Sequence, residues 1–293
     1  MTTSAQTAAR PVRPERGSIQ RRRRRTAVGS AVVLTGILFV VLAPVYWMVV
    51  TSLKSPSEFY DMRLYVAHPT LQHYIDLFST SDFGIQLFNS LGVAICATVV
   101  TVVISVMAAY SLTRLRFRGR AAATAGVFFA YLLPPTLLLI PLYSMFADLH
   151  ILNNWLGLIL AYLTLTVPFC TWMLRGYLAN VPWELEEAAM VDGCSRARAV
   201  RSVVLPLIAP GVAAGALFSF TLAWNEYLYA FVFTTQARSA TAPVGISSFI
   251  VGDVIMWGEI MAGAVVMSLP ILVIYLAGQR YVVGGLTAGA VEG

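Results

Sequence analysis

The residues whose types and spacing could do chemistry are concentrated in one segment, 175–201, which lies between two long apolar stretches. This segment is the one place in the chain where charges of both signs gather. The chain contains no HExxH, GxSxG or GxxxxGK[ST] pattern, so it lacks the residues of a metalloprotease, a serine hydrolase or an intrinsic ATPase. We therefore expect that the chain is not an enzyme and that the charged segment makes contacts rather than performing catalysis.

The first half of the charged segment is predicted to be a short helix. Asn180 can cap a helix that begins near Pro182. Glu184, Glu186 and Glu187 then lie in its first turns, where the positive end of the helix dipole favours carboxylates.

The second half of the segment is predicted to bend and begin a new helix. Asp192 and Gly193 end the first helix, because glycine tolerates the left-handed conformation that closes a helix. Ser195 can cap a second helix that runs towards Pro206 and Pro210. The segment is thus expected to form two helices joined by a glycine bend.

Cysteines and histidines give no sign of a metal site or a disulfide framework. The three cysteines are odd in number and widely spaced, so we expect them to be packing residues. The three histidines lie in or beside predicted loops without metal-ligand spacing, and we expect them on the surface. These residues are Cys96, Cys170, Cys194, His68, His73 and His150.

The composition of the whole chain indicates an integral membrane protein. Of its 293 residues, 58% are hydrophobic and 12% are charged, whereas soluble domains carry about 25% charged residues. The net charge of +6 comes from short basic segments between apolar stretches, so lipid headgroups are a better counter-charge than nucleic acid.

Six uncharged or nearly uncharged stretches are long enough to cross the hydrocarbon core, which takes about 20 apolar residues. They are 27–50, 88–112, 121–147, 151–174, 210–233 and 260–279. Segment 239–252 is also uncharged but has only 14 residues, so we expect a loop or an interfacial segment. Several spans contain proline, and in a membrane such kinks are tolerated where helices pack or line a cavity.

The basic residues predict the orientation, because Lys and Arg in short loops stay on the cytoplasmic side. With the N-terminus inside, 17 of the 20 basic residues fall in inner segments and three, Lys54, Arg63 and Arg238, fall outside. The predicted fold is an all-α integral membrane bundle of six transmembrane helices with both termini cytoplasmic. We expect a disordered Arg-rich tail at 1–26, the membrane domain at 27–279 and a cytoplasmic tail at 280–293.

The charged segment resembles the EAA loop of ABC importer permeases, in which EAA is followed by a gap, Gly, nine residues, and then an aliphatic residue, any residue, Leu and Pro. The matching residues are Glu187, Ala188, Ala189, Asp192, Gly193, Val203, Leu205 and Pro206. Other stretches resemble the carbohydrate branch of these permeases, the family of the maltose permease subunit. They are 51–54, 108–116, 133–135, 224–226 and 285–289. The resemblance covers about residues 43–293; the chain departs from it in its arginine-rich front and in Glu292, where the family has Lys.

This resemblance implies a MetI-like permease fold in a bacterial inner membrane and a permease subunit that imports a sugar or sugar-like solute. The loop at 175–206 would dock into a separate, homodimeric ABC ATPase, which carries ATP and Mg, so this chain binds no cofactor. Other implied partners are a second homologous permease, forming a heterodimer, an external substrate-binding protein and lipid, but no nucleic acid. The possible translocation path includes Asn225 and Glu226, and the possible ATPase-contacting tail includes Gly285, Leu286, Thr287 and Gly289.

Two alternatives remain open at the level of sequence. An ion-coupled secondary transporter would place acidic or histidine relays in its spans and often repeats its halves. Here only Glu226 is an intramembrane acid, and no internal repeat is found. An ABC permease for a glycerol phosphate type of solute is the other alternative, because no motif identifies the solute.

Overall fold

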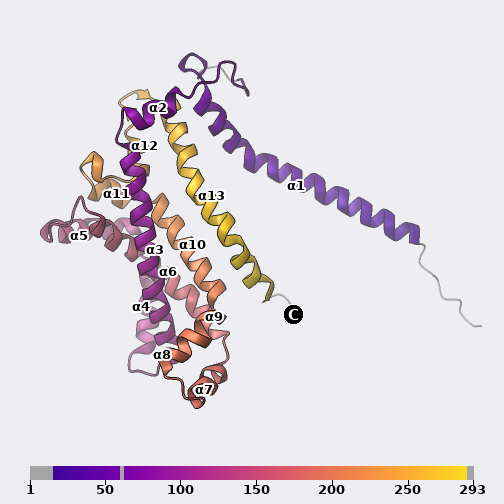
Figure 1. Cartoon of the computed structure of the whole chain (residues 1–293), viewed down its shortest axis with the longest axis vertical. Coiled ribbons are helices and arrows are strands. Elements are labelled where there is room, and N and C mark those ends of the chain that lie inside the picture. Colours follow the sequence, from indigo (N-terminus) through magenta and orange to yellow (C-terminus); the bar gives the residue numbers. More distant parts are fainter. Residues whose placement is uncertain (1–15, 60–62, 289–293) are drawn as a thin grey trace, which may run out of the picture.

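The structure is a computed structural model that describes residues 16–59 and 63–288, with side chains described for 29–59 and 63–279. Most of the described chain is helical (Figure 1). The long helices are α1 (Arg16–Leu53), α3 (Phe83–Arg114), α6 (Trp155–Ala179), α10 (Ala209–Asn225) and α13 (Trp257–Ala288). Shorter helices are η1 (Pro56–Glu58), α2 (Gln72–Ser79), α4 (Arg120–Leu132), α5 (Pro135–Asp148), α7 (Trp183–Val191), α8 (Arg196–Ala199), η2 (Val200–Val204), α9 (Leu205–Leu207), α11 (Leu228–Phe233), η3 (Ala237–Ser239) and α12 (Ala242–Ser247). Strands β1 (Ile250–Val251) and β2 (Val254–Ile255) form an antiparallel hairpin.

Apolar helices long enough to cross a membrane coincide with four of the predicted spans. They are Gly29–Leu53, Phe83–Arg114, Trp155–Ala179 and Trp257–Gln279. Two further spans result if each of two bent helix pairs crosses as one unit. The described chain therefore contains four to six candidate spans, which agrees with the predicted helical membrane fold.

The predicted span over 121–147, in which prolines were expected to cause a kink, is sharply bent. Helices α4 and α5 meet there at an angle of 98°. Leu133 and Pro134 have extended backbones, because Pro134 and Pro135 disfavour helical conformation in the residue before each of them and remove a backbone donor. The predicted stretch 210–233 is interrupted as well, since α10 ends at Asn225 and α11 begins at Leu228.

Both outer helices extend beyond the predicted domain boundaries. Helix α1 begins at Arg16, so residues 16–26 of the predicted tail are helical, and residues 1–15 lie outside the described part. No proline stands between Arg16 and Pro44, so nothing breaks the helix at its arginine run. At the other end α13 continues to Ala288, and residues 289–293 lie outside the described part.

The centre of the fold is α3, which packs along α6 and α10 (Figure 1). The buried residues of these helices include small ones, such as Ala94, Ala97 and Ala161, that are completely buried. The Thr101 and Thr166 hydroxyls, 2.6 Å apart, join α3 to α6 by a hydrogen bond. Small residues and interhelical hydrogen bonds are how helices associate in a membrane, so this packing holds α3 on two sides.

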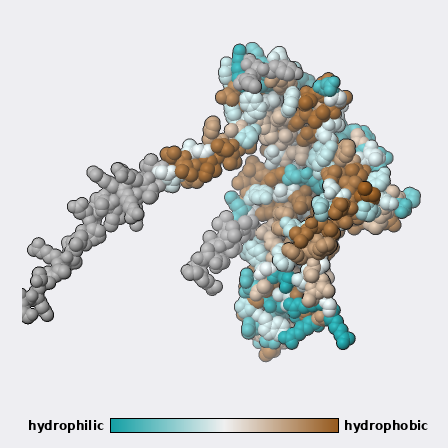
Figure 2. Space-filling model, turned by 180° about the vertical axis from the view of Figure 1, so that it is seen from behind, coloured by the Kyte–Doolittle hydropathy of each residue, from teal (hydrophilic) through white to brown (hydrophobic). Residues whose placement is uncertain are grey.

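Large apolar side chains cover the outside of the long helices. Phe39 and Val40 of α1, for example, are 75% and 70% exposed. Figure 2 shows hydrophobic residues over the middle of the molecule and hydrophilic residues gathered at its lower end. An apolar middle of this extent requires hydrocarbon as its solvent.

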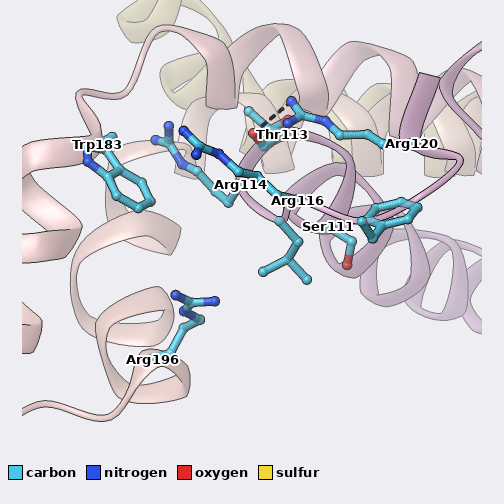
Figure 3. Close-up of a pocket in the computed structure, with 9 residues that line it drawn as sticks. Ser111, Thr113, Arg114, Arg116, Arg120, Trp183 and Arg196 are labelled. Carbon is cyan, nitrogen blue, oxygen red and sulfur yellow. Dashed lines mark hydrogen bonds between the residues drawn. The ribbon is translucent and has the colours of Figure 1, made fainter.

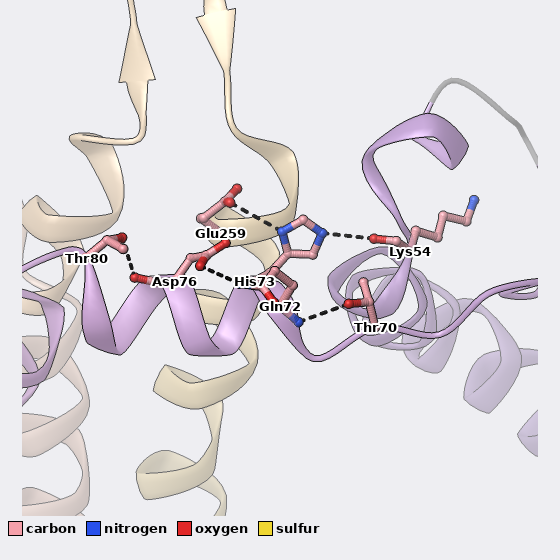
Figure 4. A network of polar contacts seen from close by, with 7 residues as sticks. All are labelled: Lys54, Thr70, Gln72, His73, Asp76, Thr80 and Glu259. Atoms are coloured by element: carbon pink, nitrogen blue, oxygen red, sulfur yellow. Dashed lines mark hydrogen bonds and ion pairs between the residues drawn. The ribbon is translucent and has the colours of Figure 1, made fainter.

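His73 of α2 is buried, and the prediction of a surface position for it is wrong. Its Nε2 lies 2.9 Å from the carbonyl oxygen of Lys54, directly after α1, and its Nδ1 lies 3.3 Å from the Glu259 carboxylate at the start of α13 (Figure 4). His68 and His150 are exposed, as predicted. One imidazole thus fastens the ends of α1 and α13 to α2.

Replacing His73 by Ala should lower the stability of the purified protein by about 1–3 kcal/mol, because a buried carbonyl and a carboxylate lose their partner. The measurement is the thermal unfolding midpoint in detergent. His68→Ala is the matched control, since His68 is exposed, and its midpoint should equal that of the wild type. Equal midpoints for both variants would contradict a fastening role.

Candidate functional site

The charged segment forms a helical hairpin at the end of the molecule opposite α2 and α12 (Figure 1). Helix α7 ends at Val191, and Gly193 has the left-handed conformation with φ +88°. The Gly193 N–H donates to Met190 O at 3.1 Å and the Cys194 N–H donates to Ala189 O at 3.0 Å. This pair of bonds is a Schellman motif, which confirms the predicted glycine bend.

Of the two predicted helix N-caps, Ser195 is confirmed and Asn180 is wrong. The Ser195 hydroxyl accepts a hydrogen bond from the Arg198 N–H at 3.4 Å and so caps α8, as predicted. Asn180 does not cap α7; it follows α6 as its C-terminal cap, and Pro182 occupies the N-cap position of α7. Asn180, Val181 and Pro182 lie between α6 and α7, so Asn180 is two positions before the N-cap and too far back for the capping role.

Most of α7 is exposed. Glu187 and Ala188 are exposed, Ala189 is half-buried, and Val191 is 87% exposed. Because Ala188 is exposed and small, another surface can approach this side of α7 closely. Farther along the hairpin, Leu205 is half-buried and Pro206 is exposed in α9, between the π-helical η2 and α10.

Glu186 was predicted to lie in the first turns of α7, but its burial and its partners were missed at the level of sequence. Its side chain is 1% exposed, and its Oε1 accepts a hydrogen bond from the Tyr110 hydroxyl of α3. Its Oε2 lies 3.5 Å from Nε of Arg114, also on α3. The i, i+4 spacing of Tyr110 and Arg114 places a hydroxyl and a guanidinium on one helix face, which is the sequence signal that could have identified this carboxylate contact.

Arginines line a pocket of about 990 Å³ beside α7, between the α3–α4 turn and α8 (Figure 3). Arg114, Arg116, Arg120 and Arg196 contribute positive charge, and Trp183 forms an aromatic wall. The Arg120 guanidinium donates to the last carbonyl groups of α3, which stabilises the negative end of that helix. The pocket makes the surface next to α7 strongly basic.

A second cavity, of about 600 Å³, lies where the two interrupted helices meet. It is lined by residues on both sides of the α4–α5 break and of the α10–α11 break, including Asn225 and Glu226. The Tyr229 hydroxyl donates to Pro135 O at 2.9 Å and joins the two breaks directly. The cavity is lined by residues with hydroxyl, amide, carboxylate and aromatic groups: Tyr131, Thr136, Thr164, Asn225, Glu226 and Tyr227.

The Glu226 carboxylate satisfies the backbone where α11 begins. Its Oε1 accepts from the Tyr229 N–H at 2.8 Å, and its Oε2 accepts from the Ala230 N–H at 3.1 Å. A negative group at a helix N-terminus is favoured by the dipole and pairs N–H groups that hydrocarbon would leave unsatisfied. Glu226 therefore both lines the cavity and caps α11.

The tail residues of the predicted ATPase contact are only partly described. Gly285, Leu286 and Thr287 belong to the last turns of α13, and Gly289 lies outside the described residues. In the part of the chain that is described, no group of three or more His, Cys, Asp or Glu side chains is arranged to hold a metal ion.

Residues 101–287 match the family described as binding-protein-dependent transport system inner membrane component. The chain is 38% identical over 270 residues to the diacetylchitobiose uptake system permease protein DasC of Streptomyces coelicolor, covering 91% of this chain and 96% of that protein. It is 36% identical over 271 residues to the trehalose transport system permease protein SugB of Mycobacterium tuberculosis, covering 92% and 99%. A crystal structure of a bacterial ABC transporter involved in the import of the acidic polysaccharide alginate includes a chain with the same fold. Its TM-score is 0.75 at 22% identity, and the match covers 89% of this chain and 98% of that one.

Replacing Glu226 by Ala should reduce stability by about 0.5–2 kcal/mol, because α11 loses its cap. Glu226→Gln should lose less, since its amide oxygen can still accept one of the two bonds. Thermal unfolding in detergent measures both effects, with Asp253→Ala, an exposed acid between β1 and β2, as the control. A Glu226→Ala midpoint equal to the wild type would show that the two hydrogen bonds do not stabilise the break.

Proposed function

The chain belongs to the family of binding-protein-dependent transport system inner membrane components, and we propose that it forms half of the pathway of an ATP-driven importer for a sugar or sugar-like solute. As in its relatives, it is a permease subunit, and ATP hydrolysis belongs to a separate subunit. The observation that carries the proposal is the rigid hairpin of α7 and α8, which stands exposed at one end of a bundle of apolar helices.

A sugar is the solute that agrees best with the relatives and with the cavity. DasC and SugB are named for diacetylchitobiose and trehalose. The cavity at the two helix breaks offers hydroxyl, amide and carboxylate groups for hydrogen bonds and tyrosine rings for the apolar faces of a sugar. We assign Asn225 and Glu226 to the translocation path on this basis.

Helix α7 is the element that docks on the ATPase. Its exposed side offers Glu187, Ala188 and Val191, and the bend at Gly193 holds this helix in a fixed relation to α8. A flexible loop would absorb a displacement, whereas a closed turn transmits it. Closure of a homodimeric ATPase, which binds ATP and Mg, would then move this hairpin and switch the bundle between inward- and outward-facing states. No cofactor is assigned to this chain.

The full assembly contains a second homologous permease, as a heterodimer, and an external binding protein, which the family description itself names. In this proposal the bent pairs α4–α5 and Arg196–Leu207 with α10 each complete a crossing, which makes six spans in a bacterial inner membrane with both termini in the cytoplasm. The end of α13, with Gly285, Leu286 and Thr287, is proposed to lie near the ATPase, whereas Gly289 lies outside the described residues.

The proposed function is tested by solute uptake into proteoliposomes that hold the complete transporter and its binding protein. Uptake should stop without ATP and should be indifferent to proton and sodium gradients. Uptake driven by either gradient in the absence of ATP would identify a secondary transporter instead.

Two substitutions in the hairpin should abolish transport by different routes. Gly193→Val places a β-branched residue at φ +88°, at a cost of about 1–3 kcal/mol. Ala189→Trp puts a large ring at the half-buried edge of the docking side, next to the exposed Ala188. Both variants should insert normally and still receive solute from the binding protein, but they should fail to retain or to stimulate the ATPase. Co-purification of the ATPase and solute-stimulated hydrolysis measure this.

The matched control is Gly252→Val, which also forces valine into a left-handed position, at φ +57°, but in the hairpin between β1 and β2. This variant should retain the ATPase. Wild-type retention and stimulation in both Gly193→Val and Ala189→Trp would exclude α7 as the docking helix.

The topology is tested by single cysteines in a background without Cys96, Cys170 and Cys194. A membrane-impermeant thiol reagent added to intact cells should label His68→Cys and should not label Arg118→Cys. Both positions are exposed, so their reactivity depends on the side of the membrane. The opposite labelling pattern would mean that the orientation is inverted.

A further inference from the structure

Helix α7 has a single fully buried side chain, Glu186, and it points away from the proposed docking side. The backbone of α7 lies against α8 and η2, whereas α3 reaches it through the side chains of Tyr110 and Arg114. Glu186 and Arg114 are 1% and 9% exposed, so this contact is screened little by water.

The contact fixes α7 at two points. The Arg114 guanidinium lies 3.5 Å from the Glu186 carboxylate, and its Nη2 donates to the carbonyl oxygen of Val181 at 2.6 Å. Val181 precedes α7, and Glu186 lies in its first turn. Two attachments to one side chain of α3 set both the position and the rotation of α7 about its own axis.

A buried carboxylate is tolerated only where its charge is paired and its lone pairs are hydrogen-bonded. The Tyr110 hydroxyl donates to Oε1 of Glu186, while Oε2 accepts no hydrogen bond from the described residues and is compensated by the charge of Arg114, whose Nε lies 3.5 Å away. Separating α7 from α3 would leave both charges without a partner in a poorly solvated place. The two helices are therefore expected to move together when either is displaced.

Helix α3 connects this contact to the cavity. It packs along α6 and α10, and these two helices supply Thr164, Leu165, Leu222 and Asn225 to the cavity wall. A continuous path of packed elements thus runs from α7 through α3 to the space where the helix breaks meet.

We infer that Glu186 is a positioning residue that ties α7 to Tyr110 and Arg114 of α3, so that a displacement of α7 by the ATPase becomes a displacement of the helices that line the cavity. The inference rests on the proposed function, in which α7 is the docking helix. It assigns Glu186 a role different from that of its neighbour Glu187, which faces outward. Glu187 meets the partner, and Glu186 transmits the movement.

The test compares Glu186→Gln and Tyr110→Phe in the complete transporter reconstituted with its ATPase and binding protein. Glu186→Gln keeps the shape and the acceptor for Tyr110 but removes the charge that pairs with Arg114. Tyr110→Phe removes one hydroxyl group only, and this small change keeps the test valid if Glu186→Gln does not fold. Three quantities are measured: ATPase retained on purification, ATP hydrolysed, and solute transported per ATP.

Both variants should retain the ATPase and hydrolyse ATP, while the solute transported per ATP falls by at least about fivefold, the lower range of typical coupling between sites. A residue that only stabilises the fold would lower the unfolding midpoint and reduce hydrolysis and transport in proportion, leaving their ratio unchanged. An unchanged ratio would therefore overturn the inference. Loss of the ATPase from both variants would also overturn it, because Glu186 would then serve docking itself.

Failure of the proposed function is distinguishable from failure of this inference. If α7 is not the docking helix, Ala189→Trp retains the ATPase and transports normally, whatever Glu186→Gln does. If α7 docks but Glu186 does not transmit the movement, Ala189→Trp loses the ATPase while Glu186→Gln and Tyr110→Phe keep a wild-type ratio of transport to hydrolysis.

Discussion

In hydrocarbon, every backbone N–H and C=O group must find its partner within the protein, and the shape of this molecule follows from that constraint. Helices can be interrupted only where other groups take over the freed hydrogen bonds. Here the two interruptions lie side by side, and the Tyr229 hydroxyl binds the Pro135 carbonyl across them. The Glu226 carboxylate pairs two N–H groups of α11 at the same place. The polar cavity is thus created by the same groups that make the breaks tolerable.

The hairpin of α7 and α8 is held in a defined shape and position although most of α7 is exposed. Its rigidity comes from a local and a distant source. The Schellman turn at Gly193 fixes the bend within the hairpin. The buried Glu186 carboxylate, held by Tyr110 and Arg114, fixes the hairpin to α3. Because α3 is packed between α6 and α10, the hairpin is joined to the helices that line the cavity.

Much of this could be predicted from the sequence, because the relevant forces act over short stretches of chain. Apolar stretches of sufficient length predicted the membrane helices, and the order of Ser, Gly and acidic residues predicted the hairpin with its bend at Gly193. A kink in the span over 121–147 could be predicted from Pro134 and Pro135, but its angle of 98° could not, because that angle depends on how the two halves pack. His73 was placed on the surface because its residue type and loop position carry no sign of Glu259, its partner across the fold.

The sequence by itself determined the class of protein, the helices and the local turns, because hydropathy, proline geometry and glycine conformation depend on neighbouring residues. It also indicated the family through the spacing of the loop residues 187–206. Only the tertiary structure decided which of two adjacent glutamates faces outward and which is buried. Tyr110 and Glu186 are 76 positions apart, and nothing in their local sequences requires them to meet. They meet because the packing of α3 against α6 brings the C-terminal end of α3 to the start of α7, where Tyr110 and Arg114 supply the partners that a buried carboxylate requires.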